Sequence, residues 1–494
     1  MKKFGIILLG ILVLVGCTPQ KKAYVHPEVP SLYYEIFVAS FYDSNGDGVG
    51  DLEGVKEKLP YIQETLGVSN LWLMPINPSP SYHKYDVVDY YDIDKSYGDI
   101  ESMKSLLSSM KDRDMTLIMD LVLNHTSSDH PWFKEAVAAK QSGTCSETKY
   151  CDYYNFSDSW QKGYNEIGSG LWYESVFTES MPDLNLDNPD VRNEIKEIVT
   201  FWFNLGVSGF RLDATTHFYE DETSKNTEFL SWFNTMAKEI NPQAYIVGEA
   251  WVPNSTIAQM YDSKIDSFFN FGVSQAQGDI VKSIKKEDGQ ALSKKVADYN
   301  DEIRSHNPKA KDAPFLSNHD NGRSASYFTD EKEQKLAASI YLTMPGTPFI
   351  YYGEEIGLKG SGIDENKRLP MIWSQKDDKG RTNPPKNADY TVPFESSVED
   401  QLKDSQSLIN HYIKVIEIRN KYSQISTANP ISLPSDAPLY VMQFDDIIVV
   451  HNLSSEQQSL TGKYEILDII SGDAKGQASQ LNVEGYSSLV IKHK

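Results

Sequence analysis

The strongest constraint on the fold is a repeat of short apolar runs, each followed by a polar segment with the periodicity of an amphipathic helix. The runs occupy residues 32–41, 69–74, 116–123, 209–212, 244–248, 267–271, 314–317 and 347–352. Strands that alternate with helices in this way predict an α/β fold with a parallel sheet covered by helices, and eight such units fit a closed (β/α)8 TIM barrel. Segments 190–205 and 228–240 are expected among its outer helices.

Two regions depart from this alternation. Residues 124–183 are rich in turn-forming residues and too long for a simple loop, so they predict an inserted domain B after the third strand. Short strand-like runs follow an expected helix at 401–422 and lie at 439–444, 447–452 and 487–491. These runs predict a C-terminal antiparallel β-sandwich domain. The expected domains are a barrel at 31–123 and 184–423, domain B at 124–183 and the C-terminal domain at 424–494.

The N-terminus has the pattern of an export signal. Lys2 and Lys3 precede an apolar run, 4–15, that is too short to span a bilayer. The sequence Leu-Val-Gly-Cys at 14–17 resembles the bacterial lipobox, in which the signal is cleaved before an acylated Cys. This resemblance implies a signal peptide at 1–16, a lipid on Cys17, a linker at 17–30 and a membrane as partner. The alternative is a soluble secreted protein cleaved after Cys17, and both place the domains outside the cytoplasm, in the cell envelope or beyond it.

The two remaining cysteines, Cys145 and Cys151, lie close together in a Gly/Ser/Thr-rich stretch. In an exported protein such a pair predicts a local disulfide. A metal site built on two isolated thiols is the weaker alternative, because no pair of histidines lies nearby.

Net charge restricts the partners of this chain. The 494 residues carry a formal charge of -23, which repels phosphate backbones, so we expect no nucleic-acid partner. A hydrophobic content of 40% and a charged content of 24% are typical of a soluble globular protein. A neutral substrate or a cation suits this composition better.

Residues 209–217 contain the first candidate for catalysis. If residues 209–213 form a strand, Arg211 and Asp213 lie on the same face, where a guanidinium can hold a carboxylate ionised. This pattern alone is more often a structural ion pair. Two other acidic residues, Glu249 and Asp320, also follow expected strands, and their presence favours the catalytic interpretation.

Barrel enzymes carry their chemistry where the strands end, so Asp213, Glu249 and Asp320 are expected to converge at one mouth. Like charges this close cannot all remain ionised cheaply, so the pKa of one carboxyl should rise. Glu249, which precedes Ala250 and Trp251, is the expected protonated acid. Retaining glycoside hydrolysis needs this combination of a nucleophilic carboxylate and an acid.

Four motifs in order resemble those of the alpha-amylase family, glycoside hydrolase family 13. They lie at 120–125, 209–217, 248–251 and 315–320, with supporting segments at 82–86, 181–185 and 350–356. The segment Met-Pro-Asp-Leu-Asn at 181–185 resembles a subgroup intermediate between oligo-1,6-glucosidases and neopullulanases. Together with the lipobox, this resemblance implies a lipoprotein alpha-amylase. Tyr82 stands where relatives that trim single glucoses from chain ends carry an Asp, which favours endo-action.

The family resemblance implies the role of each matched residue. Asp213 becomes the nucleophile that forms a covalent glycosyl intermediate, and Glu249 becomes the general acid and base. Asp320 becomes the carboxylate that binds sugar hydroxyls and favours the oxocarbenium-like transition state.

The remaining matched residues are implied to bind the sugar. Arg211 keeps Asp213 ionised, while His125 and His319 bind hydroxyls at the cleavage site. Tyr85 stacks beneath the sugar, and His83 in the same loop is grouped with the substrate-binding residues.

Residues 43–51 offer oxygen ligands at alternate positions, with a Gly at position 48 that permits a tight turn. The predicted one-loop Ca²⁺ site has as its ligands Asp43, Asn45, Asp47, the Val49 carbonyl and Asp51. Mg²⁺ is less suited to so many protein ligands, and a solvated acidic turn is the alternative without a metal.

A second Ca²⁺ site is implied only by the resemblance. Asn124, Asp183 and the His217 carbonyl match ligands that typical amylases hold between the barrel and domain B.

These inferences predict a monomeric, lipid-anchored enzyme that binds alpha-glucans. It would cut internal α-1,4 bonds of starch and maltodextrins with retention of configuration. The alternatives on the same fold are a 4-alpha-glucanotransferase and a neopullulanase or alpha-glucosidase. A glucan-binding protein without catalysis is disfavoured because all three carboxylates are present.

Overall fold

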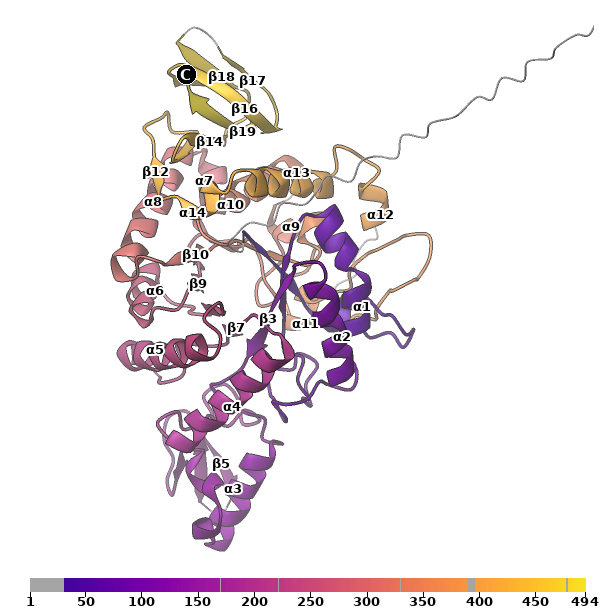
Figure 1. Ribbon diagram of the computed structural model, residues 1–494, viewed down its shortest axis with the longest axis vertical. Coiled ribbons are helices and arrows are strands. Elements are labelled where there is room, and N and C mark those ends of the chain that lie inside the picture. Colours follow the sequence, from indigo (N-terminus) through magenta and orange to yellow (C-terminus); the bar gives the residue numbers. More distant parts are fainter. Residues whose placement is uncertain (1–30, 169, 221, 329, 390–395, 477–478) are drawn as a thin grey trace, which may run out of the picture.

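The computed structural model describes residues 31–168, 170–220, 222–328, 330–389, 396–476 and 479–494. Its centre is an eight-stranded parallel sheet of order β10-β9-β8-β7-β3-β2-β1-β11 (Figure 1). The strands are β1 (Tyr33–Ile36), β2 (Asn70–Leu73), β3 (Thr116–Leu121), β7 (Gly209–Leu212), β8 (Tyr245–Gly248), β9 (Ser267–Phe269), β10 (Lys311–Ala313) and β11 (Phe349–Tyr351). The N–H groups of Thr347 and Phe349 donate to the carbonyls of Asp312, at 2.7 Å, and Pro314, at 2.9 Å. These two bonds join β11 to β10 and close the predicted barrel.

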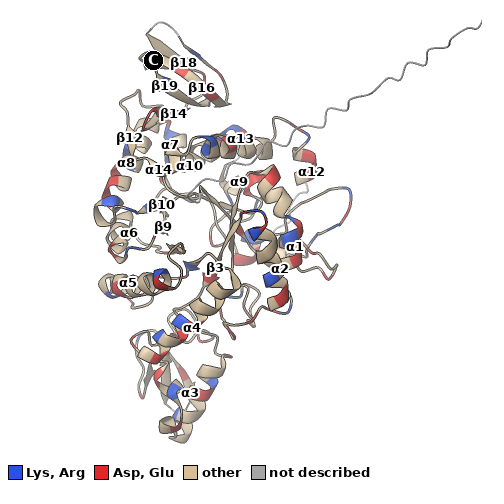
Figure 2. Ribbon diagram, in the orientation of Figure 1, with Lys and Arg blue, Asp and Glu red and all other residues tan. Residues whose placement is uncertain are grey.

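Amphipathic helices surround the barrel and contain both basic and acidic residues (Figure 2). They are α1 (Leu52–Glu57), α2 (Ile100–Lys111), α4 (Pro189–Leu205), α5 (Thr223–Ile240), α6 (Asn254–Met260), α7 (Asp279–Lys286), α8 (Gly289–His306), α9 (Ser324–Tyr327), α10 (Glu331–Leu342), α11 (Asp364–Lys367), α12 (Val398–Gln401), α13 (Leu408–Lys421) and α14 (Gln424–Thr427). In helix α4 the sequence sets both ends: the Asn188 side chain caps the first turn, and Gly206, with φ 112°, ends the helix. Its buried stripe, which includes Ile195 and Trp202, follows the predicted periodicity.

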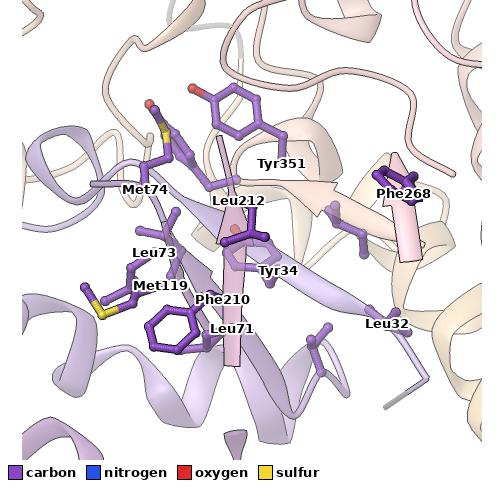
Figure 3. Packing of buried hydrophobic residues seen from close by; sticks show 14 of the residues in the cluster. Leu32, Tyr34, Leu71, Leu73, Met74, Met119, Phe210, Leu212, Phe268 and Tyr351 are labelled. Atoms are coloured by element: carbon purple, nitrogen blue, oxygen red, sulfur yellow. The ribbon is translucent and has the colours of Figure 1, made fainter. Parts of the chain in front are cut away.

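The barrel strands separate two hydrophobic clusters, because successive side chains of a strand point to opposite faces. One cluster fills the barrel interior with rings and branched chains, including Tyr33, Trp72 and Ile118. The larger cluster contains Leu71, Met119 and other strand residues that pack against the helices (Figure 3). A residue two positions after an interior-facing residue also faces the interior. Where the strand ends, such a residue can therefore place a polar side chain in the mouth of the barrel.

Residues between β3 and α4 form a separate small unit at one end of the molecule (Figure 1). It contains α3 (Pro131–Ser142) and a sheet of order β4-β6-β5. Its strands are β4 (Phe156–Ser157), β5 (Tyr164–Gly168) and β6 (Leu171–Glu174). Cys145 and Cys151 form the predicted disulfide, with their Cα atoms 5.6 Å apart.

Two antiparallel sheets lie at the opposite end of the molecule (Figure 1) and confirm the predicted sandwich. The first, of order β12-β13-β14-β19-β16, has strands β12 (Pro430–Ser432), β13 (Leu439–Phe444), β14 (Ile447–Asn452), β16 (Tyr464–Ser471) and β19 (Ser488–His493). The second, of order β15-β18-β17, has strands β15 (Gln458–Thr461), β17 (Ala474–Gly476) and β18 (Gln480–Val483). Leu439, Val450 and Leu481 belong to the apolar core between these sheets.

Three predicted elements were misplaced. The first strand ends at Ile36 and not at 41, because a short helical turn, Val38–Ser40, follows it. The seventh strand, predicted at 314–317, lies at Lys311–Ala313 because Pro314 has no N–H for the ladder. The helix predicted at 401–422 is divided, and its longer part begins at Leu408, where the Ser407 side chain accepts from the Asn410 N–H.

The predicted signal peptide, the linker and the acylated Cys17 lie outside the described residues. Across the described part of the chain, every helix is too short or too polar to cross a membrane.

Candidate active site

A single buried guanidinium connects three carboxylates at the mouth of the barrel. Arg211, at the end of β7, is 1% exposed. Its Nη1 donates to Asp120 Oδ1, at 2.9 Å, and to Asp213 Oδ1. Its Nη2 lies 3.0 Å from Glu249 Oε2. Arg211 and Asp213 thus lie on one face of their strand, as the alternation of side chains predicts. Asp120 from β3 and Glu249, which directly follows β8, contact the same guanidinium.

Glu249 has the environment of a protonated acid. Burial, followed by the nearby charges of Asp213 and Asp320, raises its pKa to about 7, although Arg211 opposes the rise. The Ala214 N–H donates to Glu249 Oε2 at 3.0 Å, so this N–H and Arg211 both contact the same oxygen. Ala214 reaches this position with φ 47°, a left-handed conformation that costs a non-glycine residue energy. Because two donors already contact Oε2 of Glu249, the proton of its acid form is carried by the other oxygen, Oε1.

His319 and Asp320 lie on the loop after β10. His319 is completely buried, with its Nδ1 2.6 Å from Glu35 Oε1 and its Nε2 3.0 Å from Asp320 Oδ2. The Tyr85 ring stacks on His319 with centroids 5.6 Å apart, and its Oη lies 2.7 Å from His319 Nε2. Although burial alone would raise the pKa of Asp320, the charges of His319 and Arg368 lower it, so Asp320 is an anion.

Arg368 extends this network to one rim of the mouth. Its Nη2 lies 3.3 Å from Asp320 Oδ1, and its Nη1 donates to the Tyr82 hydroxyl at 2.8 Å. Asp364, one turn earlier in the chain, pairs with Arg368 and accepts from the Tyr82 hydroxyl at 2.6 Å. Sequence reasoning missed Arg368 and Asp364, because neither lies in a matched motif.

The two other candidate histidines lie near the same mouth. His125 is buried, its ring meets the edge of Phe177 at 5.4 Å, and its Nε2 has no hydrogen-bond partner among the described residues. His83 lies 5.9 Å from Tyr85 between ring centroids, and Tyr85 N–H donates to its Nδ1 at 3.1 Å. Burial lowers the pKa of both histidines, so they are neutral and each can accept or donate a hydrogen bond.

The predicted Ca²⁺ loop lies away from this network, just before α1. Its acidic side chains accept backbone N–H groups: Asp43 from Gly46 at 2.6 Å, Asp47 from Val49 at 2.8 Å, and Asp51 from Gly54 at 2.6 Å. Asn45 in the same loop accepts from the Asp47 N–H. Within the described ranges, no three His, Cys, Asp or Glu side chains gather as a metal site. The predicted ligands are all hard oxygens, as Ca²⁺ prefers, and they include the Asn45 amide and the Val49 carbonyl beside the three carboxyls.

The second set of predicted metal ligands is partly assembled. Asn124 Nδ2 donates to Asp183 Oδ1 at 3.1 Å, and Val176 N–H donates to Oδ2 of the same carboxyl at 3.1 Å. His217 lies beyond Phe177, with the two ring centroids 5.0 Å apart. The side chains of Asn124 and Asp183 therefore meet, but an amide N–H faces the carboxyl where a ligand oxygen would be needed.

Comparison with known proteins identifies the family of this chain. Residues 35–428 match the family model described as "Alpha amylase, catalytic domain". The chain belongs to the alpha-amylase family. It is 38% identical to Alpha-amylase 3 of Dictyoglomus thermophilum over 98% of both chains. It is also 31% identical to the 4-alpha-glucanotransferase of Thermotoga neapolitana, over 87% of this chain and 97% of the relative. The structure of Eubacterium rectale Amy13B superposes with a TM-score of 0.90 at 37% identity, covering 94% of this chain and 95% of that one.

Membership of the alpha-amylase family makes this chain a glycoside hydrolase or transferase. An alpha-glucan substrate is consistent with this family. The intermediate subgroup inferred from residues 181–185 is also consistent with these relatives. Because their names include both hydrolases and transferases, the reaction and the bond cleaved have to be argued from the site.

Proposed function

We propose that this enzyme hydrolyses internal α-1,4-glucosidic bonds of starch and maltodextrins with retention of configuration. The observation that carries this proposal is Arg211, whose guanidinium contacts both Asp213 and Glu249. In this proposal Asp213 is the nucleophile beside the guanidinium, while burial keeps Glu249 protonated near neutral pH. Retaining glycosidases require such a pair with unlike protonation states.

In the proposed reaction, a carboxylate oxygen of Asp213 attacks the anomeric carbon and forms a covalent glycosyl ester. Glu249 donates its Oε1 proton to the leaving glycosidic oxygen, so that the departing chain leaves as an alcohol. Glu249, now ionised, then accepts a proton from water as the water attacks the same anomeric carbon. This second displacement releases Asp213 and restores the original configuration.

The remaining polar groups are proposed to hold the sugar between these carboxyls. The unpartnered Nε2 of His125 is suited to a sugar hydroxyl, which would satisfy a buried group that otherwise costs energy. Asp320, kept ionised by His319 and Arg368, is suited to hydroxyls whose bonds strengthen as positive charge develops on the ring. The face of Tyr85 would support the same sugar.

Two considerations support α-1,4 endo-action. The 38% identical relative that matches nearly the whole chain is named an alpha-amylase. In addition, Tyr82 stands in place of the Asp that closes the pocket of enzymes acting at chain ends, and its hydroxyl bonds to Arg368 and Asp364.

A glucanotransferase is the second candidate, and one surface feature favours it. Trp251, two residues after the acid, is 53% exposed, and its ring stacks on Phe271 with centroids 4.8 Å apart. An exposed indole fixed in this way offers a flat face for an acceptor sugar, which would intercept the covalent intermediate in place of water.

Products distinguish these activities. We would follow soluble starch, pullulan and reducing-end-labelled maltoheptaose with protein that begins at residue 18. Early mixtures of short maltodextrins from starch, with pullulan intact, are expected for an endo-acting amylase. Elongated maltodextrins with few new reducing ends would identify a transferase. Glucose alone would identify an alpha-glucosidase, and panose from pullulan a neopullulanase.

We also propose that the enzyme is monomeric and tethered to the cell envelope through an acylated Cys17. The support is the lipobox-like sequence at 14–17. Full-length protein made in bacteria fed an alkynyl fatty acid should incorporate the label and sediment with membranes, whereas Cys17→Ala should do neither. Light scattering of the protein beginning at residue 18 should give the mass of one chain.

A further inference from the structure

Below the proposed catalytic carboxyls lies a buried acid that no matched motif contains. Glu35 is the last interior-facing residue of β1 and is 1% exposed. Its register partners on the neighbouring strands are Trp72 and Tyr351, so the carboxyl lies at the rim of the barrel interior. Its Oε1 is 2.6 Å from Nδ1 of His319, which is itself fully buried. A charge in an otherwise apolar strand is costly unless it is paired.

The hydrogen bonds around His319 restrict its protons. Nδ1 faces the Glu35 carboxyl, which is an acceptor when ionised. Nε2 faces the Asp320 carboxylate at 3.0 Å and the Tyr85 hydroxyl oxygen at 2.7 Å. That hydroxyl has one proton and donates it to Asp120 Oδ2 at 3.0 Å. When Glu35 is ionised and Tyr85 donates to Asp120, acceptors face both ring nitrogens, and all of these bonds are satisfied if each nitrogen carries a proton and the ring is a cation.

We propose that Glu35 is a positioning residue for glycosyl transfer, acting through His319, which it fixes as an imidazolium. The ring in turn holds Asp320 ionised through its Nε2 N–H. This inference rests on the proposed function only for its catalytic consequence, because the charge of His319 is a property of the protein without substrate.

Surrounding charges support the assignment. The groups around His319 are Glu35 on β1, Tyr85 after β2 and the adjacent Asp320, with the Trp72 ring edge-on at 5.6 Å. Asp120 on β3, which accepts from the Tyr85 hydroxyl, adds a further nearby carboxyl. Burial lowers the pKa of His319, but Asp320 and Glu35 together outweigh it and raise that pKa to about 10. Two carboxylates on opposite sides of one ring thus maintain its charge across the neutral range.

Removal of the Glu35 charge tests this role. In Glu35→Gln the amide oxygen can still accept from Nδ1, so the orientation of the ring is kept while its charge partner is lost. The pKa of His319 should then fall, and above it Nε2 would turn an unprotonated nitrogen toward Asp320. Glu354→Gln is the matched control, because Glu354 is also fully buried and bonded to hydroxyls of Tyr341 and Ser317, but does not contact His319.

The first arm is nitrogen NMR of histidine-labelled protein without substrate, with the His319 signals identified by their loss in His319→Gln. Wild-type and Glu354→Gln should show a doubly protonated ring at pH 8, and Glu35→Gln should show a neutral ring. A neutral His319 in the wild-type protein at pH 8 would overturn the proposal, even if Glu35→Gln failed to fold.

The second arm measures kcat/KM on maltoheptaose from pH 5 to pH 8 as the ratio of variant to wild-type, which cancels the titration of Glu249. For Glu35→Gln this ratio should fall at least tenfold across the range, whereas for Glu354→Gln it should stay constant. A constant ratio for Glu35→Gln would reduce Glu35 to a structural role. Wild-type protein inactive on every glucan would instead refute the proposed function, and the NMR arm would still decide the charge of His319.

Discussion

Replacement of Glu249 by Gln should make the protein more stable and inactive. Burial raises the pKa of Glu249 from 4.5 to about 7 in the folded protein. A raised carboxyl pKa means that the folded state binds the proton more tightly than the unfolded chain. Stability from this group is therefore fully present below pH 4.5 and is lost as pH rises to 7. At about 1.4 kcal/mol per pKa unit, the loss at pH 8 is roughly 3 kcal/mol.

Glu249→Gln is neutral at every pH, and its amide oxygen can still accept from Arg211 and the Ala214 N–H. An unfolding entropy of about 2.1 cal/mol/K per residue gives roughly 1 kcal/mol/K for a chain of this length, so 3 kcal/mol corresponds to about 3 °C. Calorimetry should find the melting temperature of the variant above that of wild-type by about 3 °C at pH 8, with no difference near pH 4.5. Glu228→Gln, on an exposed position of α5, is the control and should change neither value. A variant less stable than wild-type at pH 8 would refute the argument that burial sets the protonation of Glu249.

Three further outcomes are expected. Asp213→Asn should reduce kcat by about 10⁴-fold or more with an unchanged circular dichroism spectrum, because an amide cannot form the glycosyl ester; near wild-type turnover would exclude Asp213 as nucleophile. Cys145→Ser should lower stability under oxidising conditions by about 2 kcal/mol, the value for a loop this short, and leave kcat intact; identical melting of wild-type in oxidising and reducing buffers would argue against the disulfide in solution. Chelation should lower the melting temperature of the wild-type protein, and Ca²⁺ should restore it better than Mg²⁺. The melting temperature of Asp47→Ala should change neither on chelation nor on addition of Ca²⁺. Equal responses of the two proteins would show that the loop at 43–51 is not the calcium site.

The sequence was sufficient to predict the barrel because its strands and helices follow local hydrophobic periodicity. The same alternation of side chains placed Arg211 and Asp213 on one face, which the structure confirms. It also contained a signal that was not used. Glu35 is a single charge in the apolar run 32–41, two residues after the interior-facing Tyr33, and this spacing alone directs it into the barrel.

Other features depend on contacts that sequence patterns do not encode. Arg368 meets the Tyr82 hydroxyl across 286 residues of chain, and no local periodicity relates the two positions. The seventh strand was misplaced because residues 314–317 are apolar enough for a strand, yet Pro314 lacks the N–H that would extend the ladder. Its carbonyl nevertheless accepts from Phe349, so the chain continues toward the mouth and still delivers His319 and Asp320 to the site.

The most direct test of the central claim is to trap the covalent intermediate. A fluorinated α-maltosyl fluoride combines a good leaving group with a destabilised oxocarbenium ion, so the glycosyl-enzyme forms and then hydrolyses slowly. Mass spectrometry of intact and digested protein should find one added glycosyl group, located on Asp213 and absent from Asp213→Asn. Consumption of the reagent without any adduct, or an adduct on another carboxyl group, would contradict the assignment of Asp213 as nucleophile and Glu249 as its acid partner.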